Sequence, residues 1–173
     1  MEEPKKNNFK IVKFDSAIYL KETILDKKFV SSLENVKLKK YKDNHNNYFD
    51  GDKDQVRTAL IGSYLQPHIH EIFKSDFALN RWWIQKYEKE NFHDLHTHGN
   101  EMNFYSFILY LKATSKSSKT MFYGPGYPLV NWGRKEFQPK PGLFILFPSY
   151  IPHSAGYNKD TKRLILSGNI EII

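Results

Sequence analysis

Hydrophobic positions recur at helical spacing in the first half of the chain. The spacing predicts a helix over residues 21–37 and a second over 54–79, which we expect to break before Pro67. Ahead of them, residues 1–20 predict a short tail followed by a strand, and the Asn- and Asp-rich residues 41–53 predict turns. The apolar positions of the first helix are Ile24, Leu25, Phe29, Val30 and Leu33.

Beyond residue 80 the pattern changes to short apolar and aromatic runs separated by Gly and Pro clusters. This texture predicts an antiparallel sandwich or barrel of the jelly-roll kind. We therefore expect one mainly β domain of the α+β type, in which a mostly helical support over 1–79 packs against a β core over 80–173. The predicted strands are Trp82–Tyr87, Tyr105–Lys112, Thr120–Tyr123, Leu143–Phe147 and Arg163–Ile173.

Composition narrows the chemistry. The 173 residues include no cysteine, which excludes disulfides, thiolate nucleophiles and cysteine-based metal sites. No apolar run reaches the roughly 20 residues that span a bilayer, and the N-terminus lacks an apolar signal region, so a cytoplasmic protein is expected. The net charge of +7 comes from scattered lysines, which makes nucleic acid a less favoured partner.

A histidine-rich segment, "HDLHTH", precedes one of the predicted strands. His96 and His98 would point to one face of an extended chain, because side chains alternate with a period of two. Two such imidazoles can chelate Fe, Zn, Ni or Cu. A second pair, His68 and His70, follows Pro67 in a predicted helix, where positions two apart diverge, and is expected to be structural or at the surface.

Two residues far along the chain add to this candidate site. His153 follows a strand and loop, and ten residues later Arg163 opens an otherwise apolar strand. In that strand Arg163 shares a face with Ile165 and Ser167. A buried arginine needs an anion, which is either a small dicarboxylate or a local Asp or Glu.

The order of these motifs resembles the 2-oxoglutarate/iron(II)-dependent oxygenases, and within them a subgroup frequent in marine bacteria and their phages. The resemblance spans roughly residues 80 to 170. It rests on Trp83-Ile84-Gln85, His96-Thr97-His98, the aromatic strand Ser106–Tyr110, the Gly142–Ser149 segment, His153 and the strand Arg163–Asn169.

The resemblance implies a double-stranded β-helix, similar to cupins, with N-terminal helices bracing the larger sheet. It implies an iron(II) site at His96, His98 and His153, and a contact between Arg163 and the far carboxylate of 2-oxoglutarate. His98 stands where the family usually has a carboxylate, which leaves Glu101 or Asp94 as alternative ligands.

Further roles follow from the same resemblance. Ile165 replaces a serine that lies two residues after the arginine, so Ser167 is expected to supply that hydroxyl group. Tyr110 and Gln85 are expected near the cosubstrate. His93 is expected not to be a metal ligand, and Asp94 could orient His96.

The implied activity is a dioxygenase that uses Fe(II), 2-oxoglutarate and dioxygen to hydroxylate an unactivated C–H bond. The substrate would be a peptidyl residue, a free amino acid or a nucleobase, and a homodimer stays open. Two alternatives remain: a cupin-type metal enzyme that adds Glu101 to the histidines, and a non-catalytic jelly-roll binding or virion-associated protein.

Overall fold

The computed structural model describes residues 10–14, 16–40, 47–99, 101–124, 127–128 and 133–173. Two helices and twelve strands lie within these ranges. In chain order they are β1 (Lys10–Phe14), β2 (Ser16–Glu22), α1 (Lys27–Glu34), β3 (Lys39–Lys40), β4 (Asn47–Asp50), α2 (Gln55–Phe73), β5 (Phe77–Tyr87), β6 (His93–His96), β7 (Phe104–Lys112), β8 (Thr120–Tyr123), β9 (Arg134–Phe137), β10 (Leu143–Pro148), β11 (His153–Ala155) and β12 (Arg163–Ile172).

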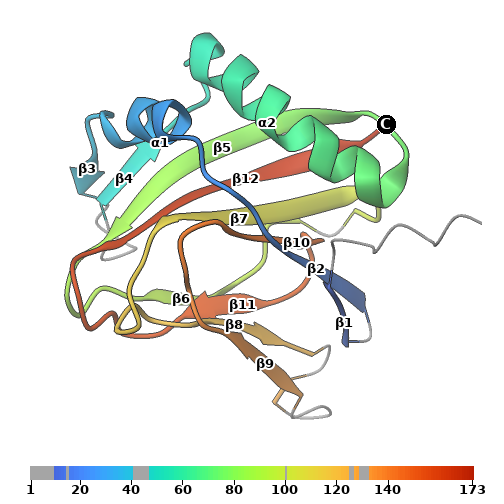
Figure 1. Ribbon diagram of the computed structural model, residues 1–173. Coiled ribbons are helices and arrows are strands. Elements are labelled where there is room, and N and C mark those ends of the chain that lie inside the picture. The colour runs from blue at the N-terminus through green and yellow to red at the C-terminus, as the bar shows by residue number, and fades with distance from the viewer. Residues whose placement is uncertain (1–9, 15, 41–46, 100, 125–126, 129–132) are drawn as a thin grey trace, which may run out of the picture.

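The strands form two antiparallel sheets that face each other (Figure 1). The larger sheet has eight strands in the order β1-β2-β10-β7-β12-β5-β4-β3, and the smaller has four in the order β6-β11-β8-β9. Both helices cover the face of the larger sheet that is turned away from the smaller sheet (Figure 1). The structure thus has three layers, which are helices, large sheet and small sheet.

The central strands of the larger sheet bury side chains on both faces. In β10, Phe144 and Leu146 pack under the helices, whereas Ile145 and Phe147 point between the sheets. β7 alternates in the same way, with Leu109 toward the helices. Burial on both faces explains why these strands read as continuous apolar runs rather than as alternating patterns.

Helix α2 runs without interruption through Pro67, so the expected break is wrong. The ring of Pro67 removes one helical hydrogen bond, at a cost of about 3 kcal/mol. Ile61, Leu65 and Ile69 lie on one face of the helix on both sides of the proline, and all three are fully buried against the sheet. That packing holds the helix together across the proline.

Helix α1 is shorter than expected and begins at Lys27, because the Asp26 carboxylate caps it by accepting hydrogen bonds from the amides of Lys28 and Phe29. Residues 16–22, ahead of it, form β2 and pair with β10, which agrees with the strand expected within residues 1–20. The N-terminal half therefore contributes β1 to β4 to the larger sheet in addition to its two helices.

The expected mainly β jelly roll is confirmed, and all five predicted strands are present with boundaries shifted by a few residues. The strand expected within residues 1–20 is present as β1 and β2. Five short strands were not predicted: β3, β4, β6, β9 and β11. Each has two to four residues, too few to show a pattern. Within the described part of the chain, neither helix combines the length and apolar character needed to cross a membrane.

His68 and His70 lie on α2, away from the other histidines, as expected for structural and surface residues. The His68 ring packs against Tyr64 and Phe144, and its Nδ1 atom is buried without a hydrogen-bond partner among the described residues. Burial, with a smaller contribution from Lys21, lowers the pKa of His68 to about 4. His70 is exposed.

The difference between the pKa of His68 in the folded chain and its ordinary value predicts a pH-dependent stability. Between pH 6.5 and 4 the unfolded chain takes up a proton at His68 that the folded chain does not, so the contribution of His68 to stability falls as the pH is lowered through this window and is constant above it. When the pH is lowered from 7 to 5, the free energy of unfolding of His68→Leu should fall by about 1 kcal/mol less than that of wild type, after allowance for the partial exposure of His68. Urea denaturation at the two pH values measures this. His70→Leu should behave as wild type. Equal losses in wild type and His68→Leu would refute the assignment.

Candidate metal centre and anion pocket

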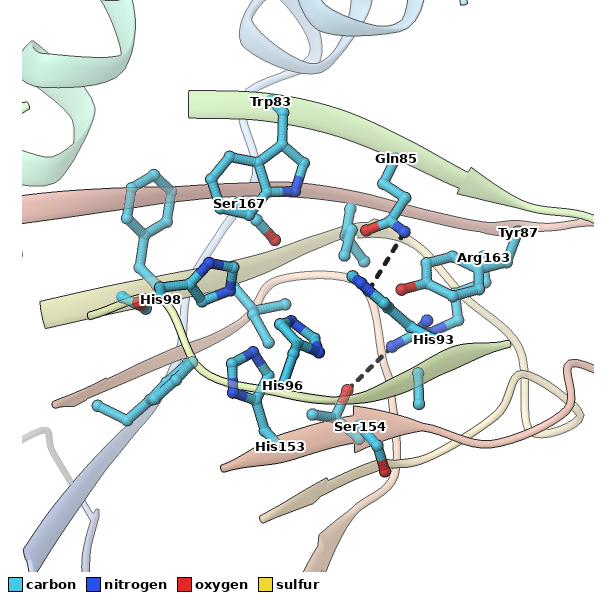
Figure 2. Close-up of a pocket in the computed structure, with 17 residues that line it drawn as sticks. Trp83, Gln85, Tyr87, His93, His96, His98, His153, Ser154, Arg163 and Ser167 are labelled. Atoms are coloured by element: carbon cyan, nitrogen blue, oxygen red, sulfur yellow. Dashed lines mark hydrogen bonds between the residues drawn. The ribbon is translucent and has the colours of Figure 1, made fainter. Parts of the chain in front are cut away.

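Three histidines from separate segments converge between the two sheets. His96 ends β6 and lies opposite His153, the first residue of β11, across the antiparallel pair. His98 follows two residues after His96, and its amide donates to the Ser149 carbonyl at 2.9 Å. The potential ligand atoms of the three side chains all lie within 4.8 Å of one another (Figure 2). Two metal–nitrogen bonds of about 2.1 Å at roughly right angles place their nitrogen atoms about 3 Å apart, so side-chain rotations would close this group around one ion.

Backbone carbonyls fix the protonation of two of these rings. Nδ1 of His96 lies 2.7 Å from the Asp94 carbonyl, and Nδ1 of His153 lies 3.0 Å from the Ile151 carbonyl. A carbonyl can only accept, so both Nδ1 atoms carry the proton and both Nε2 atoms keep a lone pair for a metal. Asp94 thus orients His96, as expected, but through its backbone carbonyl.

All three rings favour the neutral state. Burial lowers the pKa of His98 to about 3, aided by His96 and Arg81, and lowers the pKa of His96. The pKa of His153, which is only 4% exposed, lies well below its ordinary value for the same reason. Neutral imidazole is the form that binds metal, so near neutral pH the group needs to release no proton.

A cavity extends from the histidines to Arg163, the first residue of β12 (Figure 2). Arg163 is 1% exposed, and its guanidinium lies 3.9 Å from the centre of the Tyr87 ring. Burial acts to lower the pKa of Arg163, but Tyr87 and Tyr110 outweigh it and raise the pKa. The guanidinium is therefore positively charged throughout the physiological range.

No carboxylate of the described residues pairs with this buried charge. One amino group of Arg163 donates to Thr120 Oγ1 at 2.9 Å, whereas Nε and Nη1 have no hydrogen-bond partner among the described residues. Of the two anions left open by the sequence, a local Asp or Glu is thus absent from the described part of the chain. An unpaired buried cation is costly, which leaves Arg163 ready for an anionic ligand.

The structure brings most of the other expected residues to this cavity. Gln85 and Ser167 line it, as does Ile165, which confirms that Arg163, Ile165 and Ser167 share a face of β12. Tyr110 is fully buried just behind the lining, where its hydroxyl group shares a hydrogen bond with Thr120.

Sequence reasoning missed Thr120 as a site residue. It begins β8 and lies two residues before the buried Phe122, on the same inward face of the strand, so it is a polar residue on an otherwise apolar face. That pattern was the available signal, but without the pairing of β8 with β11 nothing linked it to the histidines.

The two carboxylates considered as alternative ligands lie elsewhere. Asp94 and Glu101 are exposed, and neither belongs to the metal-binding group found among the described residues. His93 is also outside that group, although its ring stacks on His96 with 4.0 Å between centroids.

A second space opens on another side of the histidines. It has a volume of about 270 Å³, and His93, His96 and His98 line both this groove and the cavity that leads to Arg163. Its remaining walls are Tyr48, Arg81, Trp83 and Asn169. The histidine group is therefore accessible from two distinct spaces.

No family model matches the sequence, and no curated protein is similar to it in sequence. The fold, in contrast, is similar to solved structures. One is the non-heme α-ketoglutarate-dependent epimerase SnoN from nogalamycin biosynthesis, 13% identical, with 90% of this chain and 77% of that chain covered and a TM-score of 0.70. Another is a Pseudomonas putida prolyl-4-hydroxylase, 14% identical, with 90% and 92% covered and a TM-score of 0.67.

A third is HygX from Streptomyces hygroscopicus with nickel, 2-oxoglutarate and hygromycin B bound, 10% identical, with 90% and 83% covered and a TM-score of 0.69. At this level of identity the likeness shows a shared fold, that of the 2-oxoglutarate/iron(II) oxygenase structures. The residues of this chain must carry any functional conclusion.

The metal group predicts which side chains matter for metal binding. His96→Ala and His153→Ala should each weaken nickel(II) binding by at least about a hundredfold, measured by isothermal titration calorimetry, because each removes a ligand. His98→Ala should also weaken it. Asp94→Ala and Glu101→Ala should bind as wild type, and a loss in either would show that a carboxylate completes the site.

The unpaired guanidinium predicts an unusual stability effect. Arg163→Met keeps much of the side-chain volume and removes a buried charge that has no anion, so it should raise the free energy of unfolding by about 1–3 kcal/mol. Chemical denaturation without ligands measures this. A destabilised Arg163→Met protein would show instead that the arginine is a structural residue.

Proposed function

We propose that this protein is an Fe(II)- and 2-oxoglutarate-dependent dioxygenase that hydroxylates an unactivated C–H bond of a primary substrate. The observation that carries the proposal is the pairing of a three-histidine group with a buried arginine that lacks a counter-ion, in one cavity. A metal and a dianion are the two ligands that this pair of features fits.

The donor set fits iron(II). His96, His98 and His153 would hold the ion, and imidazole nitrogen is a common ligand for it. Three neutral ligands leave the full dipositive charge on the metal, whereas a carboxylate would cancel part of it. That charge and the Arg163 cation would together attract a dicarboxylate to the cavity between them.

The bound metal with 2-oxoglutarate and dioxygen supplies the oxidising chemistry, with succinate and carbon dioxide as co-products. The protein binds, orients and shields. Arg163, whose Nε and Nη1 have no hydrogen-bond partner among the described residues, would bind one carboxylate, while Thr120, held by Tyr110, keeps the guanidinium in place. Phe147 and Ile165 line the cavity with apolar surface, which limits water near the reacting groups.

The groove of about 270 Å³ is the proposed position of the primary substrate. It reaches the same histidines from a different side, so a substrate there would approach the metal without displacing a ligand bound to Arg163. Its surface is mixed: the rings of Tyr48 and Trp83 stack, and Arg81 is paired with Asp50 at 2.8 Å. A peptidyl residue, an amino acid or a nucleobase, each of which offers both apolar and polar groups, is compatible with these walls.

The same observations disfavour the alternatives. A cupin-type site of three histidines and a glutamate would need Glu101, which is exposed and outside the histidine group. A non-catalytic jelly roll would have no need for a buried, unpaired Arg163 facing preset metal ligands. Both features cost stability unless a ligand uses them.

Anaerobic titration tests the proposal. Addition of 2-oxoglutarate to the iron(II)-loaded protein should produce a metal-to-ligand charge-transfer band. Arg163→Met should weaken 2-oxoglutarate binding by about 10- to 100-fold, since it removes charge-assisted hydrogen bonds. The matched control is Arg57→Met on α2, whose arginine pairs with Asp54 and should not affect binding.

Two results would count against the proposal. If iron(II) binds but the wild-type spectrum does not respond to 2-oxoglutarate, the oxygenase assignment fails. If Arg163→Met binds as tightly as wild type, the assignment of Arg163 as the anchor fails.

A further inference from the structure

His93 lies between the metal ligands and the arginine. Its ring stacks on His96 with 4.0 Å between centroids and 19° between planes, and its Nδ1 lies 3.4 Å from Gln85 Nε2. Figure 2 shows the ring in the space between His96 and Arg163. A ligand that touches both the metal and Arg163 must pass through this space.

The cavity is too small for such a ligand while His93 stays there. Its free volume is about 20 Å³, little more than one water molecule needs. 2-Oxoglutarate has five carbons and two carboxylates. The proposed function therefore requires a rearrangement of the lining, and the position of His93 identifies the side chain that obstructs the path.

The local structure leaves His93 free to move. It is the first residue of β6, an edge strand of only four residues, and the pairing of β6 with β11 changes register beside it. The hydrogen bond to Gln85 is long at 3.4 Å. His93 also lines the groove of about 270 Å³, so the groove has room for its side chain when it rotates out of the cavity.

We propose that His93 controls the access of the dicarboxylate cosubstrate to Arg163. In its stacked position it fills the path between the metal ligands and Arg163, and rotation toward the groove opens that path. This inference rests on the proposed function. In this role His93 controls access and is not a metal ligand. A ligand reaches Arg163 only after the stack of His93 on His96 and its hydrogen bond to Gln85 have been broken.

The test compares two substitutions of opposite steric effect. His93→Ala clears the path and should tighten 2-oxoglutarate binding to the nickel(II)-loaded protein by about tenfold, the equivalent of one ring stack and one weak hydrogen bond. His93→Phe keeps a stacking ring in place and should bind 2-oxoglutarate no more tightly than wild type. His70→Ala, at an exposed position of α2, is the matched control.

Isothermal titration calorimetry measures nickel(II) affinity first and 2-oxoglutarate affinity second. Unchanged nickel(II) affinity in His93→Ala is expected, and a tenfold loss would overturn the proposal by showing that His93 is a metal ligand. Weaker 2-oxoglutarate binding by both variants would also overturn it, because His93 would then contact the cosubstrate favourably.

The remaining outcomes distinguish failure of the His93 role from failure of the proposed function. If wild type and His93→Ala bind 2-oxoglutarate equally, the role of His93 is refuted while the proposed function stands. If nickel(II) binds but neither protein then binds 2-oxoglutarate, both are refuted.

Discussion

The larger sheet must bury both of its faces, one under the helices and one against the smaller sheet, and this constraint decides where polar chemistry can lie. Along β10 every position that faces the smaller sheet is apolar, and in β7 the inward Ser106 interrupts the apolar run. Polar side chains enter the space between the sheets mainly from β5, β12 and β11, through Gln85, Arg163, Ser167 and His153. The candidate site is the region where the apolar interior gives way to a charge and a group of imidazoles.

Within that region the backbone does much of the preparation. The cross-strand pair of His96 and His153 brings together residues that are far apart in the sequence, and two carbonyls set which nitrogen of each ring is available. Burial then keeps the rings neutral. Arg163, in contrast to the neutral imidazoles, keeps its charge in the interior although no carboxylate of the described residues pairs with it. The folded chain thus maintains a site whose electrostatic cost a bound metal and anion would offset.

How much could be read from the sequence depended on the length of each element. The helical regions gave periodic patterns, and the long strands appeared as apolar runs separated by Gly and Pro clusters. The face shared by Arg163 and Ser167 followed from strand alternation alone. The continuity of α2 through Pro67 did not, because it depends on tertiary packing that the local pattern does not contain.

For the site, the resemblance that rests on the order of His96, His98, His153 and Arg163 predicted a single site, and the structure brings these residues together. The hydrogen bond from Arg163 to Thr120 could not be predicted, because it depends on the register in which short strands pair. The position of His93 is similar: the sequence indicated only that it is not a metal ligand, and the structure shows its stack on His96 and its place in the cavity lining.

The most direct test of the central claim is the conversion of 2-oxoglutarate to succinate in air. At a 2-oxoglutarate concentration well below the dissociation constant of wild type, the iron(II)-loaded protein should release succinate, slowly without a primary substrate and faster with one. Arg163→Met should release about 10- to 100-fold less at that concentration, and the metal-free protein should release none above background. Failure of the iron(II)-loaded wild type to release succinate, or equal release by Arg163→Met, would contradict the account.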